Sequence, residues 1–222
     1  MIYDLDFSPL KPYTAALKRG VCLTIILSVL STILGSIIGA IAGVALRWSR
    51  IRDVLLVCND IVRAIPIIVL MFFLYYFPYQ DAFGLQPPSA FVVSVLALSI
   101  SQAAFTADLV RGAIDGVSRS SVEAAMAIGL TDIDIARFIV APDVLRQILP
   151  SLNAFFIGNI KLSSIAAVIG CEEVVFTARV AVSQTYRSTE AWIVVGLIYV
   201  FLVIPLAWAA RRLERSDWLK RR

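Results

Sequence analysis

The chain has 222 residues, of which 59% are hydrophobic and 16% are charged, and its mean hydropathy is +0.85. A soluble domain of this length usually carries more charge and alternates apolar with polar positions, so the composition excludes an ordinary soluble protein. The net charge of +4 does not indicate nucleic-acid binding, because the basic residues stand at the ends of apolar runs instead of forming one patch.

Five apolar runs dominate the chain, and none of them contains a charged side chain. A helix needs about 20 apolar residues to cross the hydrocarbon core, at roughly 1.5 Å per residue. In chain order the runs cover residues 20–46, 65–80, 89–107, 148–160 and 191–210. The second and fourth runs are short, so we expect their spans to borrow flanking residues and to lie near 55–77 and 151–170. The sequence therefore predicts a single membrane domain, residues 1–222, of the all-α class with five transmembrane helices.

The first two spans contain residues that shape helices. Gly35, Gly39 and Gly43 recur every four residues, so they share one helix face and let another backbone approach closely. We expect this face to pack within the subunit and not to form a dimer seam. Pro66 removes a backbone hydrogen bond from the second span and predicts a kink or a local unwinding. The aromatic-rich segment 72–77 at the end of this span predicts an interfacial belt.

Basic residues fall mainly on one side of the predicted spans. On that side lie Arg47, Arg50, Arg52, Arg111, Arg119, Arg137, Arg146, Arg211, Arg212, Arg215, Lys220, Arg221 and Arg222. The other side has Lys11, Lys18, Arg19, Arg179 and Arg187. The positive-inside rule places the richer side in the cytoplasm. We therefore expect the amino terminus outside and the carboxyl terminus in the cytoplasm, with residues 171–190 as an outer loop.

The chain lacks the residue patterns of metal, redox and nucleotide sites. Cys22, Cys58 and Cys171 are isolated, and the chain has no histidine, so a zinc site, a disulfide scaffold or a histidine base is not expected. The P-loop pattern is missing as well, so the chain is not expected to hydrolyse ATP itself. We expect no catalytic residue, no metal and no cofactor on this chain.

The polar segment between the third and fourth spans, about residues 116–147, is patterned as two short helices. Residues 120–123 have the form of a capping box, in which a Ser caps the helix and a Glu reaches back. Gly129 suits the left-handed position that closes a helix. A second N-cap follows at Thr131, and its helix is expected to end before Pro142. This helix–turn–helix could insert into a groove on another protein or pack beneath the chain's own spans.

The same segment resembles the EAA loop of ABC importer permeases, with a mild departure at Ala141, where leucine is common. The matching residues, at the spacing of that family, are Glu123, Ala124, Ala125, Gly129, Ile139 and Pro142. The resemblance implies the type I ABC importer permease fold. It also implies that these six residues belong to cytoplasmic coupling helices, which dock an ATP-binding subunit.

Three flanking segments resemble permeases for polar amino acids of the histidine, glutamine, arginine or opine type. Residues 63–66 are similar to R-G-T-P of that family, residues 104–112 to A-Y-x-A-E-x-x-R-G, and residues 161–165 to K-D-T-S-L. Ile65 replaces the Thr of the first motif, and Leu162 replaces the Asp of the third. In family members with a site inside the membrane, that Asp meets a cationic side chain. Leu162 therefore argues against an arginine-like substrate.

Polar residues within the predicted spans are candidates for a substrate pathway, because a charge in the bilayer usually faces protein, water or a partner. Asp60 lies three residues from Arg63, and Asp108 lies three from Arg111, so local ion pairs are favoured over substrate contact. Small polar residues either line a pathway or hold helices together. The candidate pathway residues are Arg63, Pro66, Gln102, Asp108, Lys161, Leu162, Ser163 and Ser164.

Lys161 is the candidate that lies deepest in an apolar run, and three roles are open to it. It could bind a substrate carboxylate, pair with Asp108 or Asp60, or extend to the cytoplasmic interface.

The sequence and the resemblance predict a permease subunit of an ABC importer that moves a polar amino acid or related small compound inward across the bacterial inner membrane. The partners implied are two ATP-binding subunits that hold ATP and Mg, and a second permease, identical or homologous. An extracytoplasmic solute-binding protein and membrane lipid complete the set, without nucleic acid. The alternatives are a carrier or channel driven by an ion gradient, and a membrane receptor or scaffold whose loop docks a partner that is not an ATPase.

Overall fold

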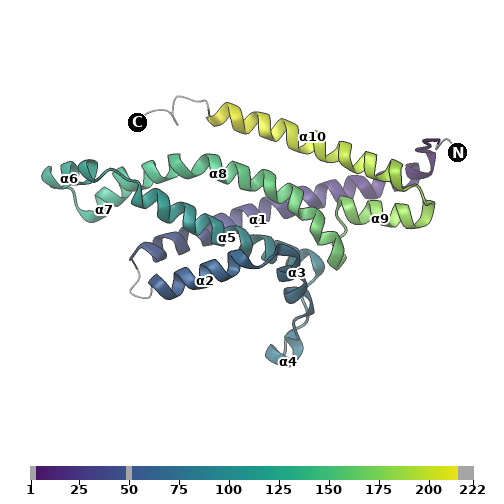
Figure 1. Ribbon diagram of the computed structural model, residues 1–222, viewed down its shortest axis with the longest axis horizontal. Helices are drawn as coiled ribbons and strands as arrows, with labels where there is room; N and C mark the ends of the chain where they lie inside the picture. The colour runs from purple at the N-terminus through teal and green to yellow at the C-terminus, as the bar shows by residue number, and fades with distance from the viewer. Residues whose placement is uncertain (1–3, 49–51, 215–222) are drawn as a thin grey trace.

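A computed structural model describes residues 4–48 and 52–214, and every regular element in these ranges is a helix. Four long helices, α1 (Thr14–Trp48), α5 (Ala90–Asp115), α8 (Ala141–Leu162) and α10 (Ser188–Glu214), run side by side along the long axis of the molecule (Figure 1). The shorter described elements are η1 (Ser8–Tyr13), α2 (Arg52–Ala64), α3 (Ile67–Tyr76), α4 (Tyr79–Phe83), α6 (Arg119–Ala127), α7 (Asp132–Ile135), η2 (Ala136–Val140), η3 (Ser163–Ile169) and α9 (Val174–Thr185).

Within the described residues, four helical segments are long and apolar enough to cross a membrane, and a broken pair supplies a fifth. The continuous segments are Ser8–Leu46, Ala90–Asp115, Asp132–Ile169 and Ser188–Arg212. The broken pair is α2 and α3, which meet at an angle of 96°. The predicted number of five spans holds when this pair is counted as one broken span.

The break between α2 and α3 lies at Pro66, so the predicted kink is confirmed. Proline has no amide hydrogen with which to continue α2. Helix α3 starts afresh, with the amides of Val69 and Leu70 donating to the Pro66 carbonyl at 2.9 and 3.1 Å. Two helices at nearly a right angle therefore replace the single bent helix of residues 55–77.

Helices α1 and α5 approach each other closely through the three glycines of α1. A Cβ atom built on Gly35, Gly39 or Gly43 would lie 2.9, 2.6 or 2.6 Å from the carbonyl oxygen of Ser99, Ala103 or Ala107, respectively. Real side chains cannot occupy such positions, so glycine is what allows the two backbones to touch. The predicted packing of this face within the subunit is confirmed.

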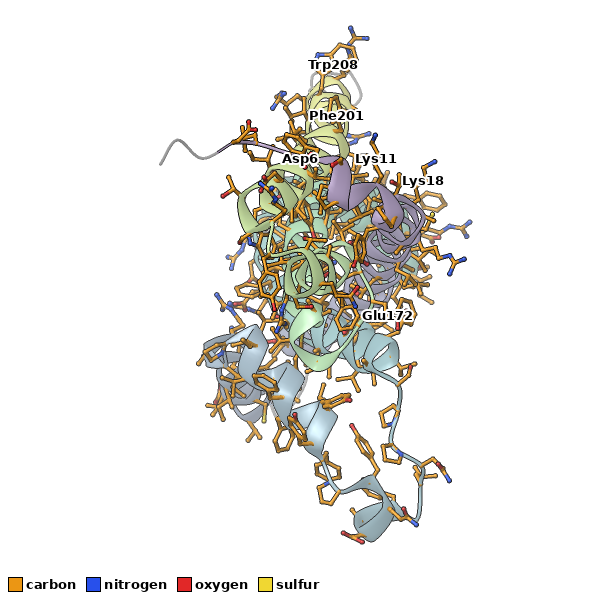
Figure 2. All side chains as sticks on the ribbon, turned by 90° about the vertical axis from the view of Figure 1, so that its right-hand side faces the viewer. Asp6, Lys11, Lys18, Glu172, Phe201 and Trp208 are labelled. Carbon is orange, nitrogen blue, oxygen red and sulfur yellow. The ribbon has the colours of Figure 1, made fainter. Side chains whose placement is uncertain are left out.

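The largest apolar cluster lies where α3 and η3 pack on the α1–α5 pair, and it contains Leu27, Met71 and Leu98. Helix α10 differs, because few of its side chains are buried. Phe201 is 75% exposed and Trp208 is 51% exposed. Both lie toward the margin of the bundle in a view along its long axis (Figure 2). An apolar helix with this exposure is suited to face lipid.

The end of the bundle that carries the amino terminus is more helical than predicted. Residues 8–19, which precede the first apolar run, form η1 and the first turns of α1, and Leu10 is buried against Ala181 and Ala191. Residues 171–190, expected as a loop, contain α9. This helix was missed because it is too short to span and because its N-cap residue is Glu173, which is not a preferred capping residue.

Basic residues lie at both ends of the molecule. Arg119 and Arg137 lie on α6 and η2, which stand at the end opposite the amino terminus (Figure 1). Lys11 and Lys18 lie on η1 and the first turns of α1, at the end that carries the amino terminus (Figure 1). Five basic residues used in the topology prediction lie outside the described residues, namely Arg50, Arg215, Lys220, Arg221 and Arg222.

Replacing Gly39 with valine is expected to lower the free energy of unfolding by about 1–3 kcal/mol or more, the usual cost of overpacking. The new Cβ would lie 2.5 Å from the Cβ of Thr106 and would push α1 away from α5. Thermal unfolding of the purified protein in detergent measures the effect. The control is Gly196→Val on α10, where a Cβ atom meets nothing within 4 Å. Equal unfolding temperatures for the two variants would contradict the importance of this contact.

Candidate functional site

Helices α6 and α7 project beyond the ends of the long helices (Figure 1). Between them, Gly129 adopts φ +84°, a conformation that suits glycine because it has no Cβ. The Gly129 amide donates to the Met126 carbonyl at 2.9 Å, and the Leu130 amide donates to the Ala125 carbonyl at 3.1 Å. These bonds close α6, as expected from a glycine at this position.

The predicted N-cap at Thr131 is confirmed, and it forms a full capping box. The Asp134 amide donates to Thr131 Oγ1 at 3.3 Å, and the Thr131 amide donates to the Asp134 carboxylate at 3.4 Å. Two amides at the start of α7 are thereby satisfied. The turn between α6 and α7 is therefore held by the Gly129 closure on one side and by the Thr131 capping box on the other.

The predicted capping box at Ser120 and Glu123 is wrong. Helix α6 already begins at Arg119, so its N-cap is Ser118, whose side chain makes no capping hydrogen bond and lies 2.7 Å from Ser120 Oγ instead. Among the described residues, Glu123 has no hydrogen-bond or ion-pair partner. Helix α6 therefore exposes Glu123 and the neighbouring Ala124 and buries Ala125 against the chain.

The second short helix does not end before Pro142, which corrects another prediction. Helix α7 runs through a π-helical turn, η2, directly into α8. In this turn the Ala141 amide donates to the Ala136 carbonyl, and Ile139 is half-buried. Pro142 stands in the first turn of α8, directly after the π-helical turn, and it donates no amide hydrogen bond back into that turn. The projecting hairpin is thus joined to α8 by continuous helix.

The projecting hairpin exposes apolar side chains. The exposed fraction is 78% for both Ile128 and Ile133, and Met126 and Phe138 are also more than half exposed. An open hollow of about 810 Å³ lies between this hairpin and the end of α5, with Glu123 in its wall. Exposed apolar surface of this kind marks an interaction site.

Charged residues on α2 and α5 form a connected network. Arg63 lies 3.7 Å from Asp60, and Arg111 lies 3.2 Å from Asp108, so both predicted local pairs are present. The Arg63 guanidinium also donates to the Asp108 carboxylate and lies 5.1 Å from the ring centre of Phe105. Spacing along the sequence does not reveal this third pair, because its members are 45 residues apart.

Gln102 holds three helices together. Its Nε2 donates to the Thr32 carbonyl at 3.1 Å and to Ser36 Oγ at 3.0 Å, and its Oε1 accepts from Asn159. Asn159 Nδ2 also donates to Thr32 Oγ1 at 2.9 Å. These bonds join α1, α5 and α8, and Gln102 is buried. Of the two roles predicted for Gln102, the hydrogen bonds support the one of helix packing.

The serines at the end of α8 bond to their own helix. Ser163 is buried and donates to the Ile160 carbonyl at 2.8 Å, and Ser164 donates to the Lys161 carbonyl at 2.7 Å. Both stand where α8 changes into the tighter η3. Their hydroxyls are therefore used in shaping this junction.

Lys161 and Leu162 are exposed on α8. Among the described residues, no carboxylate forms an ion pair with Lys161, so the predicted pairing with Asp108 or Asp60 is not observed. Leu162 lines a narrow hollow of about 180 Å³ between α5 and α8, together with Phe105. Leu162 thus lines a small cavity in the spanning region, and Lys161 is its exposed neighbour in the sequence of α8.

Sequence reasoning missed Glu173, which joins three helices near the amino-terminal end of the bundle. Its Oε1 accepts from the Phe176 amide at 2.9 Å, and its Oε2 accepts from Tyr199 at 3.2 Å and from Thr24 at 3.5 Å. The residue is fully buried, and this burial raises the pKa of Glu173 above its ordinary value of 4.5. Only its position between folded helices distinguishes it from the exposed Glu172.

The described residues contain no group of three or more His, Cys, Asp or Glu side chains that could hold a metal ion. Cys22 and Cys58 are exposed free thiols, and Cys171 is a buried one.

Glu173→Gln is expected to weaken the pH dependence of stability. The raised pKa means that the folded protein favours the neutral carboxyl. This contribution to stability is complete below the unfolded-state pKa near 4.5 and is lost as the pH rises through the folded-state pKa. Glutamine stays neutral, so between about pH 5 and pH 8 the unfolding temperature of the variant should fall less than that of the wild type.

The exposed neighbour supplies the control for this experiment, because Glu172→Gln should follow the wild type. A Glu173→Gln profile parallel to the wild-type profile would show that the buried carboxyl does not set the pH dependence.

Comparison with known proteins identifies the family. Residues 32–216 match the family described as "Binding-protein-dependent transport system inner membrane component". The chain is 31% identical over 214 residues to the glutamine transport system permease protein GlnP of Escherichia coli, covering 96% of this chain and 97% of that protein. It is 34% identical over 163 residues to the probable amino-acid ABC transporter permease protein PatM of Vibrio harveyi, covering 69% and 71%.

A solved structure supports the same assignment. The crystal structure of an amino acid ABC transporter with histidines matches with a TM-score of 0.85 at 28% identity, covering 96% of this chain and 99% of that chain. The expected permease fold is therefore confirmed. The chain belongs to the family of binding-protein-dependent transport system inner membrane components, and it is a permease subunit of an ABC importer.

Proposed function

We propose that this chain carries a polar amino acid or a related small polar compound inward, and that residues 119–140, here called the coupling segment, link its spans to an ATPase. The observation that carries the proposal is the projection of this segment beyond the bundle with Ile128 and Ile133 exposed to 78%. An apolar surface outside the spanning helices needs a protein partner to cover it.

The family supplies the general setting of this proposal. A permease of an ABC importer spans the inner membrane several times and works with ATP-binding subunits and a substrate-binding protein. ATP hydrolysis takes place in the partner subunits, since the permease forms the membrane passage. ATP and Mg therefore belong to the partners in our proposal.

Six residues of the coupling segment and its continuation are proposed to contact or position the ATP-binding subunit: Glu123, Ala124, Ala125, Gly129, Ile139 and Pro142. Glu123 is exposed and has no partner among the described residues, which leaves its carboxylate available to another subunit. Gly129 and Pro142 shape the segment, through the left-handed turn and the start of α8.

The assembly that we propose contains a second permease, identical or homologous, and two ATP-binding subunits. Closing of the ATP-binding subunits on ATP would move both coupling segments. In this chain the helix is continuous from α7 through η2 into α8, so the movement would reach the span that holds Lys161 and Leu162. The spans would then alternate between outward-facing and inward-facing arrangements.

We propose that the coupling segment is cytoplasmic and that the amino terminus is outside. Arg119 and Arg137 lie on the coupling segment itself, as the positive-inside rule expects of the cytoplasmic face. The carboxyl-terminal end of α10 lies at the same end of the molecule (Figure 1).

The substrate class rests on the relatives and on the hollow between α5 and α8. The named relatives are permeases for glutamine or for amino acids more generally. The hollow is lined by Gln102, Phe105, Asn159 and Leu162 among others, without an acidic side chain. A cationic substrate side chain would lack a counter-charge there, whereas Lys161 close by on α8 suits a carboxylate. We therefore propose a substrate with a neutral or acidic side chain.

Charge reversal at Glu123 is expected to uncouple the chain from its ATPase. Glu123→Lys breaks no bond within the described residues, so the variant should fold and insert normally. Retention of the ATP-binding subunit on the purified permease, and ATP-dependent uptake into proteoliposomes, should each fall by about tenfold or more, the scale of a lost interfacial charge contact.

The matched control is Asp81→Lys on α4, an exposed acid on another short helix far from the coupling segment. Loss of the ATPase in both variants, or in neither, contradicts a specific contact at Glu123. Uptake that follows an ion gradient without ATP supports the carrier or channel alternative instead.

Neutralising Lys161 is expected to abolish substrate-stimulated ATP hydrolysis while assembly with the partner subunits is kept. Lys161→Met retains the length and apolar stem of the side chain but removes the cation that we assign to the substrate carboxylate. Lys161→Arg, which keeps the charge, should retain most of the stimulation. Normal stimulation in the methionine variant rules out a required contact between Lys161 and substrate.

A further inference from the structure

The two halves of the broken span are anchored very differently. Helix α3 buries Leu70 and Met71 in the largest apolar cluster of the bundle. Helix α2 has no buried residue. Close packing holds an element in one position, so α3 has that restraint and α2 does not.

The connection between α2 and α3 has the properties of a hinge. The chain turns by 96° at residues 65–66, and no helical hydrogen bond can be donated by Pro66. The bonds that close the first turn of α3 all lie on its own side of the break, at the Pro66 carbonyl. Rotation about the backbone at Ile65 would therefore reorient α2 without disturbing α3.

Two polar contacts hold α2 against α5. Asn59 Nδ2 donates to the Ala104 carbonyl at 3.2 Å, and one turn further along both helices Arg63 donates to the Asp108 carboxylate. The other Asp108 oxygen accepts from Arg111 at 3.2 Å, so the carboxylate is fixed on α5 and presented to α2. These two contacts between α2 and α5, one helical turn apart, are here called the polar seam.

An apolar groove lies behind this seam. Its volume is about 290 Å³, and its walls include Leu55 and Val62 of α2, Ala42 of α1 and Ala103 of α5. A groove means that α2 lacks the dense contacts with α1 that α5 makes through the glycines. The polar seam therefore carries much of the restraint on α2.

The seam borders the hollow that we assign to substrate. Arg63 lies over the ring of Phe105 at 5.1 Å, and Phe105 lines the hollow between α5 and α8. Asp108 lies seven residues before Asp115, where α5 ends and the chain passes through residues 116–118 into α6. One helix thus connects the coupling segment, the seam and the hollow.

We propose that α2 is a movable gate hinged at residues 65–66, and that the ion pair between Arg63 and Asp108 is the latch that holds it on α5. This proposal rests on the proposed transport function for the gate's purpose, but the hinge and latch themselves do not depend on it. The Arg63 and Asp108 side chains are 36% and 23% exposed, and a partly hydrated ion pair is weak enough to open and close in each cycle. Arg63 and Asp108 act in this proposal as positioning residues and not as substrate ligands.

The latch is tested first in the purified permease in lipid nanodiscs, without ATPase or substrate. Spin labels are placed at Val57→Cys on α2 and Leu145→Cys on α8, both exposed, after replacement of Cys22, Cys58 and Cys171. Val57 is eight residues from the hinge, roughly 12 Å along the helix, so a rotation of about 15° moves the label by about 3 Å. Either Arg63→Gln or Asp108→Asn should broaden or shift the label-to-label distance on this scale.

The double variant and the other half of the span supply the controls. Arg63→Gln with Asp108→Asn should resemble either single variant, because one ion pair can be lost only once. Labels at Phe73→Cys on α3 and Leu145→Cys should keep their distance in all variants, since α3 is anchored in the core. Unchanged distances from α2 in both single variants overturn the latch.

The gate is tested by a reversible cross-link in the complete transporter. In the same cysteine background, Arg63→Cys with Asp108→Cys should show raised ATP hydrolysis without substrate when reduced, because the latch is absent. Disulfide formation between them should arrest uptake, and reduction should restore it. A Ser31→Cys and Ser99→Cys pair in the close α1–α5 contact, where Ser99 Oγ lies 3.4 Å from the Ser31 carbonyl, should transport equally well in both redox states.

The outcomes separate this proposal from the proposed function. The gate is overturned if uptake after complete cross-linking of α2 to α5 is as fast as uptake before the disulfide forms. If the wild-type complex shows no ATP-dependent uptake while the spin-label distances still respond to the latch variants, the transport function fails and the latch is supported.

Discussion

The close contact of α1 with α5 is the interaction on which the rest of the bundle depends. Lipid removes most of the hydrophobic gain from helix association, so dense packing and interhelical hydrogen bonds must hold spans together. The glycines at 35, 39 and 43 supply the first, because carbonyl oxygens of α5 occupy the space of three missing side chains. Gln102 and Ser99 supply the interhelical hydrogen bonds along the same α1–α5 contact. Helices α3, α8 and α9 then pack on this pair, which serves as their common support.

In our proposals the coupling segment and α2 are the moving parts, and both lie outside the close packing of the α1–α5 pair. The coupling segment is attached at both ends to spans, to α5 through residues 116–118 and to α8 through the π-helical turn. In the proposed mechanism, a displacement of this segment would therefore act on both walls of the hollow that contains Phe105 and Leu162. Helix α2 lacks such packing and depends on polar contacts to α5, so it is the element that can respond with the least loss of buried surface.

Polar groups inside the bundle are costly unless they have partners, and their partners reveal what each group does. Gln102 and Asn159 satisfy each other between three helices, and Glu173 is bonded from α1, α9 and α10. These residues are explained by packing. Lys161 differs, because it is exposed on α8 and forms no ion pair with the described carboxylates. This is why we propose a role toward substrate for Lys161.

Features that depend on neighbouring residues could be predicted from the sequence: the apolar runs, the break at Pro66, the left-handed turn at Gly129 and the N-cap at Thr131. The four-residue spacing also indicated that Gly39 shares one helix face with the other two glycines, because this spacing defines a face regardless of what packs against it. The long-range contacts could not be predicted in this way, because side chains distant in sequence meet only after the helices have packed. The pairing of Arg63 with Asp108 and the burial of Glu173 are of this kind. The false capping box at Ser120 has a related cause, since a cap depends on where the helix begins, and α6 begins two residues earlier than the motif requires.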